Sequence, residues 1–171
     1  MTDKRGTHDY VEDIRNSEIL IYINGKFYPR QDASISVFDS GFLLGDGVWE
    51  GIRYHNGKFM FLDMHLERLF WGASQIDMDI GKTIDEIKSI LDETVKFNKM
   101  KTGVHVRLIV SRGVKSTPYQ DPSFTISEPT IVVIPEYKAP SPETQKNGIK
   151  LVSVDIIRGG TNIQDHRINS L

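Results

Sequence analysis

The fold of this chain is decided by residues 45–69, GDGVWEGIRYHNGKFMFLDMHLERL. The strand-like run VWEGIRY ends at Asn56-Gly57, a pair that accepts the positive φ angles of a type I′ turn, and KFMFL follows as the return strand. The apolar period then changes to that of a helix, for which Asp63 is the expected N-cap. The stretch therefore predicts a β-hairpin that leads into an amphipathic helix.

The rest of the chain adds elements of the same two kinds. A further hairpin is expected around the Asn-Gly pair at residue 24, and a second helix from Thr83, which forms a capping box with Glu86. Two more strands follow, at residues 103–111 and 130–134. This order predicts an α+β fold, a mostly antiparallel sheet with two helices on one face, plus the start of a larger second domain.

Composition changes along the chain predict four regions. The polar, charged residues 1–18 are expected to be a mobile N-terminal arm, ahead of a small α+β domain at residues 19–137. Two prolines in a polar setting mark residues 138–147 as an interdomain linker. A strand is expected at residues 149–157, but one strand is too little for a second core. Residues 148–171 are therefore expected to be the start of a truncated large domain.

The composition of the 171 residues argues against several classes of function. With 21 basic and 23 acidic side chains the formal net charge is −2, whereas nucleic-acid binders carry a strong basic excess. The absence of cysteine excludes disulfides, thiolate metal sites and a cysteine nucleophile. No apolar run approaches the about 20 residues of a membrane helix. We expect a cytoplasmic protein without nucleic-acid or membrane partners.

A glycine-rich run, GFLLGDGVWEG, occupies residues 41–51. It lacks the G-K-[ST] of a P-loop, and it does not open a helix as a dinucleotide-binding fingerprint does. Glycine permits unusual backbone angles, so the run predicts a tight turn into a strand. On this pattern alone, Trp49 and Glu50 are expected to be structural.

Three basic side chains are candidates for ligand binding. Arg68 lies beside the apolar stripe of the first helix, and His65 lies one turn before it. From this position the Arg68 side chain either turns inward and binds a phosphate bidentately or extends along the protein surface. His105 and Arg107 share the polar face of an alternating strand and point either to water or into a cleft that suits a carboxylate. The five histidines lack H-x-x-x-H spacing, so no metal site is expected.

Three motifs together resemble the class IV aminotransferases, the fold-type IV pyridoxal-phosphate enzymes. The motifs are GDGVWEGIRYHNGKFMFLDMHLERL, VHVRLIVSRG and DHRINSL. The group includes branched-chain and D-amino-acid aminotransferases and aminodeoxychorismate lyase. The resemblance implies a small α+β domain and a larger second domain, with pyridoxal 5'-phosphate between them at a homodimer interface. It also implies transfer of an amino group from an amino acid, with a branched-chain donor preferred, to a 2-oxo acid such as 2-oxoglutarate.

The resemblance also assigns roles to individual residues. Arg68 matches the arginine that binds the cofactor phosphate. Trp49 matches an aromatic wall of the substrate pocket, and Arg107 matches the arginine that organises recognition of the substrate carboxylate. His105 stands where branched-chain members carry tyrosine, although imidazole still donates a hydrogen bond.

The clearest departure from the family pattern is Asn169, which stands where typical members carry the lysine that attaches to the cofactor. Asparagine has no basic amine, so no catalytic residue is assigned in this chain and we expect these residues alone to be inactive. The preferred hypothesis is the leading part of a longer aminotransferase. A lyase acting on aminodeoxychorismate and a lysine-free homologue that only binds or regulates are the alternatives.

Overall fold

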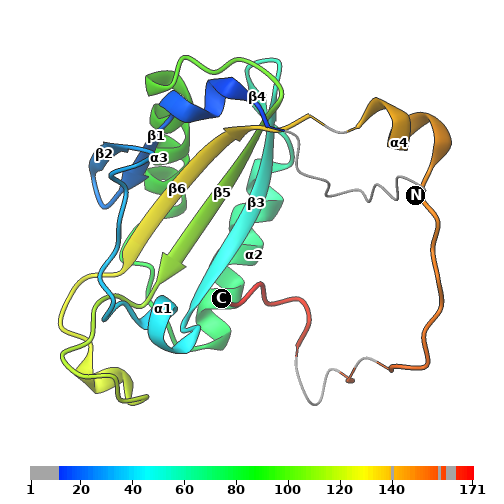
Figure 1. Cartoon of the computed structure of the whole chain (residues 1–171). Helices are drawn as coiled ribbons and strands as arrows, with labels where there is room; N and C mark the ends of the chain where they lie inside the picture. The colour runs from blue at the N-terminus through cyan, green and yellow to red at the C-terminus, as the bar shows by residue number, and fades with distance from the viewer. Residues whose placement is uncertain (1–11, 140, 158, 161–164) are drawn as a thin grey trace.

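The computed structural model describes residues 12–139, 141–157, 159–160 and 165–171 (Figure 1). Its centre is a six-stranded antiparallel sheet in the order β2-β1-β6-β5-β3-β4. The strands are β1 (Leu20–Ile23), β2 (Lys26–Pro29), β3 (Gly47–His55), β4 (Lys58–Phe59), β5 (Val104–Ser111) and β6 (Thr130–Tyr137). The helices are α1 (Ser40–Leu44), α2 (Leu62–Gln75), α3 (Ile84–Phe97) and α4 (Pro142–Asn147), with 3-10 helices at Ile14–Glu18 and Pro122–Phe124.

The core lies between the sheet and the two long helices, α2 and α3, which cover the same face of the sheet (Figure 1). Side chains alternate along a strand, so one face of β5 is apolar and fully buried while the other carries the polar residues. The helices complete the core with the apolar stripes expected from their spacing. The prediction of an α+β fold with two helices on one face is confirmed. The core residues of these elements include Val104, Val106, Leu108, Val110, Leu66, Leu69, Ile87 and Leu91.

The junction between the second hairpin and α2 differs from the prediction. Asn56 and Gly57 have the expected positive φ angles, 48° and 76°, but β4 is only two residues long. Phe61 then adopts φ +53°, and α2 begins at Leu62. Asp63 is therefore not the N-cap. It lies in the first turn, where its negative charge is favourable near the helix N-terminus.

The start of α3 agrees with the prediction. The Thr83 hydroxyl accepts a hydrogen bond from the Glu86 amide at 3.2 Å, and the Glu86 carboxylate accepts one from the Thr83 amide at 2.7 Å. Both halves of the capping box are therefore present, and two backbone donors at the helix start are satisfied.

Two regions expected to lack regular structure contain short helices. The 3-10 helix Ile14–Glu18 falls within the expected arm, and the Asn16 side chain exchanges hydrogen bonds of 3.0 and 2.8 Å with the backbone of Tyr137 in β6. Residues 1–11 of the arm lie outside the described residues. Helix α4 occupies part of the expected linker, and Ser141 caps its N-terminus.

The strand expected at residues 149–157 is wrong. The segment pairs with no described strand, and all of its apolar side chains are exposed, including Leu151 at 82%. An apolar run becomes a strand only beside a partner that satisfies its backbone groups, and the described residues offer none at this place. Residues 169–171 pair with the sheet instead, along the edge of β3 beyond its short contact with β4.

Candidate functional site

Strand β3 carries the candidate site because its side chains alternate between two environments. Val48, Glu50 and Ile52 face the helices and are buried. Trp49 and Arg53 face the other side of the sheet, which none of the described helices covers (Figure 1). A carboxylate thus lies at an inward position between two aliphatic residues, where burial without partners would be costly.

The partners of Glu50 come from α2. Arg68 donates from Nε and Nη2 to the two carboxylate oxygens of Glu50, both at 2.6 Å, and His65 Nδ1 lies 2.8 Å from Glu50 Oε2. The three-residue spacing of His65 and Arg68 places both on one helix face. The Glu50 side chain is fully buried, whereas that of Arg68 is 45% exposed. This bidentate hydrogen bond to Glu50 raises the pKa of Arg68 above its usual value.

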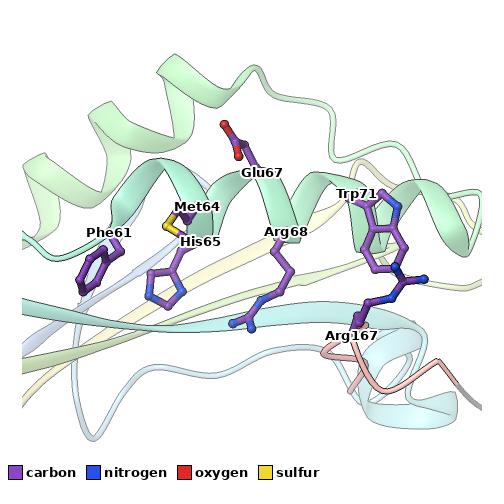
Figure 2. Close-up of a pocket in the computed structure, with 7 residues that line it drawn as sticks. All are labelled: Phe61, Met64, His65, Glu67, Arg68, Trp71 and Arg167. Carbon is purple, nitrogen blue, oxygen red and sulfur yellow. The ribbon is translucent and has the colours of Figure 1, made fainter. Parts of the chain in front are cut away.

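The outer side of this ion pair opens into a pocket of about 800 Å³, within the range of small-molecule sites. Figure 2 shows His65 and Arg68 projecting from α2 toward β3, whereas Glu67 points to the other side of the helix. Arg167 lies over the Trp71 ring, 4.7 Å from its centroid, and pairs with Asp165. The lining residues are Phe61, Met64, His65, Glu67, Arg68, Trp71 and Arg167.

A second polar group lies on the uncovered face of the sheet. Arg107 stacks on Trp49, with Cζ 4.0 Å from the ring centroid. His105 lies over Gly51, where an added Cβ would come within 2.9 Å of its Nε2. His105 and Arg107 share a face of β5, as predicted, and the sheet places Trp49 of β3 beside them. Arg68 is separate from this group, because it lies on the helix side of β3.

His105 is uncharged near neutral pH. Burial, reinforced by the positive charges of Arg107 and Arg53, lowers the pKa of His105 from 6.5 to about 4. A neutral imidazole beside a permanently charged guanidinium donates one hydrogen bond without adding a second charge.

This pKa predicts a loss of stability in acid. Between pH 6.5 and about 4 the unfolded chain takes up a proton at His105 that the folded chain does not, so the free energy of unfolding falls as pH falls through this window. Urea titrations of His105→Gln at a series of pH values should show a shallower fall than the original chain. His55→Gln, at an exposed histidine, is the control. Equal slopes for all three proteins would contradict the assignment.

Asn169 lies along the edge of β3, beside the group formed by Trp49, His105 and Arg107. The Trp49 amide donates to the Asn169 carbonyl at 2.9 Å, and the Trp49 indole donates to the Ser170 carbonyl at 3.0 Å. Val48 and Ser170 form an isolated antiparallel β-bridge, and this register places Asn169 opposite Trp49.

Sequence reasoning missed the role of Glu50, which was assigned to structure alone. The signal was present, because Glu50 occupies an inward position of the strand between Val48 and Ile52. It also missed the pocket contribution of Arg167. Within the part of the chain that the structure describes, no cluster of acidic residues and histidines could hold a metal ion, and no helix has the length and hydropathy to cross a bilayer.

Comparison with known proteins places the chain in a family. The model of the amino-transferase class IV family matches residues 47–168, which include both polar groups. The chain is 34% identical over 154 residues to branched-chain-amino-acid aminotransferase-like protein 1 of Arabidopsis thaliana, covering 90% of this chain and 28% of that protein. It is 36% identical over 153 residues to a protein of Methanocaldococcus jannaschii named as a branched-chain-amino-acid aminotransferase, covering 88% and 51%.

A solved structure shares the fold. The branched-chain amino acid aminotransferase of the organism abbreviated T.th., complexed with N-(5'-phosphopyridoxyl)-L-glutamate, superposes with a TM-score of 0.75 at 22% identity, over 90% of this chain and 50% of that one. The chain thus spans about half or less of the length of these proteins. With the family model matched over most of its length, this chain belongs to the class IV aminotransferases.

Proposed function

We propose that this chain is the cofactor-phosphate-binding part of a longer, homodimeric, pyridoxal-phosphate-dependent aminotransferase. The reaction would move an amino group from a branched-chain amino acid to a 2-oxo acid such as 2-oxoglutarate. The names of the relatives support the reaction class, and those of the Arabidopsis thaliana and Methanocaldococcus jannaschii proteins support the donor. The observation that carries the proposal is the Arg68–Glu50 pair at the pocket, because it presents a fixed guanidinium beside an open cavity.

The residues of the pocket fit a phosphate group. Glu50 holds Nε and Nη2 of Arg68, and no described residue accepts a hydrogen bond from Nη1, which leaves that nitrogen for a phosphate oxygen. The buried carboxylate orients the guanidinium before any ligand arrives, so less side-chain entropy is lost on binding. Trp71 offers an apolar surface next to this donor.

The group on the other face of the sheet fits the substrate. Pyridoxal phosphate, when bound, supplies the electron sink that makes the substrate α-carbon acidic. Arg107 would bind the substrate carboxylate, His105 would donate a neutral hydrogen bond to it, and Trp49 would close the side of the site. Asn169 has no basic nitrogen and cannot move the α-proton. A lysine-free protein that only binds the cofactor is therefore a second candidate.

Ligand mapping by NMR tests this proposal. Pyridoxamine 5'-phosphate is the probe because, unlike the aldehyde, it does not react with surface lysines. We expect it to shift the Trp71 indole resonance and the amides of α2 near Arg68, while the exposed face of α3 around Asp92 and Lys96 stays unchanged. Pyridoxamine without the phosphate is the control ligand. Equal shifts from both ligands, or none at the pocket, would refute phosphate binding by this site.

A further inference from the structure

The glycine-rich run before β3 lies against Leu171, the last of the described residues. A Cβ atom added at Gly41 would lie 2.8 Å from Leu171 Cδ1, and one added at Gly47 would lie 2.6 Å from the same atom. A Cβ at Gly45 would lie 2.7 Å from the Leu171 carbonyl oxygen. These separations are shorter than van der Waals contact, so Leu171 occupies space that exists because these three positions lack side chains.

The backbone next to Leu171 pairs with β3 in one register. The Leu171 amide donates to the Gly47 carbonyl at 3.1 Å, and the Trp49 amide donates to the Asn169 carbonyl. With Val48 and Ser170 as the bridge, alternation puts Leu171 and Asn169 on the uncovered face of the sheet.

The side chain on the opposite face of the same segment, Ile168, also packs against the protein. Ile168 packs against the core, and its Cγ2 would lie 3.6 Å from a Cβ added at Gly72 of α2. A slip of one residue would put Ile168 on the uncovered face and Asn169 against the helices. Because few backbone hydrogen bonds hold this segment, its register depends on the side chains at its two ends.

We propose that Leu171 is a positioning residue, and that Gly41, Gly45 and Gly47 form its socket. The socket fixes the register of residues 168–171 on β3 and so holds residue 169 opposite Trp49. Residue 169 stands where typical members of the family carry the cofactor-linked lysine, so the catalytic meaning of this register rests on the proposed function. The glycines are then part of the site through Leu171, although none of them lines the pocket.

Amide hydrogen exchange tests the socket in the chain without any cofactor. Leu171→Ala should speed exchange of the Trp49 amide and the residue 171 amide about tenfold or more, because the edge pairing opens more often. The Trp49 indole resonance should move as its bond to Ser170 is lost. The amides that pair β3 with β5 should exchange at the same rates in Leu171→Ala as in the original chain. Leu171 is 41% exposed, so the fold itself is expected to persist.

Two further variants complete the test. Leu171→Met preserves the volume of the side chain and should restore slow exchange, whereas Leu151→Ala makes the same truncation at an exposed leucine and should change nothing at β3. Unchanged exchange in Leu171→Ala would overturn the proposal, and so would equal effects of the two alanine variants. These rates involve no ligand, so failure of the socket and failure of phosphate binding at Arg68 are separate results.

Discussion

Replacing Arg68 by alanine is expected to lower the free energy of unfolding by about 3 kcal/mol, even in the absence of ligand. The reason is the asymmetry of the ion pair. The Glu50 side chain is fully buried, and without Arg68 its carboxylate keeps, among the described residues, only the hydrogen bond with His65. Glu50→Gln should be less damaging, at about 1 kcal/mol, because the half-exposed guanidinium that remains can be hydrated. Urea denaturation monitored by circular dichroism measures both values.

The double variant Arg68→Ala/Glu50→Gln separates the interaction from a general loss of packing. We expect it to be more stable than Arg68→Ala alone, because the buried charge is removed together with its partner. Arg167→Ala is the matched control. Its side chain is 73% exposed and its pair with Asp165 is at the surface, so we expect a change below about 0.5 kcal/mol. If the double variant lost as much free energy of unfolding as the two single variants added together, the coupling between Arg68 and Glu50 would be contradicted.

The 171-residue chain is expected not to catalyse transamination. With pyridoxal phosphate, L-leucine and 2-oxoglutarate, we expect glutamate to form no faster than with the cofactor alone. The physical reason is Asn169, which the resemblance to the family sets at the position of the lysine, and whose amide is neither a nucleophile nor a base. Quantification of glutamate by chiral chromatography provides the measurement.

Asn169→Ala is the matched control for this assay. It should give the same background rate as the original chain, since asparagine contributes no chemistry there. Glutamate formation that rises in proportion to protein concentration, and that Arg68→Gln abolishes, would show that the chain is active without a lysine at position 169. That result would require another group in this chain to do the work of the lysine.

The features predicted correctly from sequence are those that depend on local patterns. The capping box at Thr83 and the turn at Asn56-Gly57 involve residues close in sequence, and alternation along residues 104–111 assigned both faces of β5 correctly. The cap at Asp63 was wrong because Phe61 takes a left-handed conformation where the chain leaves the sheet, which no residue preference indicates.

The features that sequence reasoning missed depend on contacts between distant residues. Glu50 and Arg68 are 18 positions apart, and their pairing requires both the strand register and the rotation of α2. The pairing of residues 169–171 with β3 brings the start of the family-matched region next to residues just past its end, and it relies on space left by glycines. The apolar run at residues 149–157 has strand-like composition but no partner among the described strands, so composition alone misassigned it.

We propose that Arg68 binds the phosphate of a vitamin B6 compound. Isothermal titration with pyridoxamine 5'-phosphate, comparing the original chain with Arg68→Gln, tests it most directly. We predict that the dissociation constant for pyridoxamine 5'-phosphate is about tenfold or more higher in Arg68→Gln, because loss of a charge-assisted hydrogen bond usually weakens binding by at least this factor. Pyridoxamine, which binds more weakly, should have the same dissociation constant in both proteins. Equal affinity of the two proteins for the phosphorylated ligand would refute phosphate binding by Arg68.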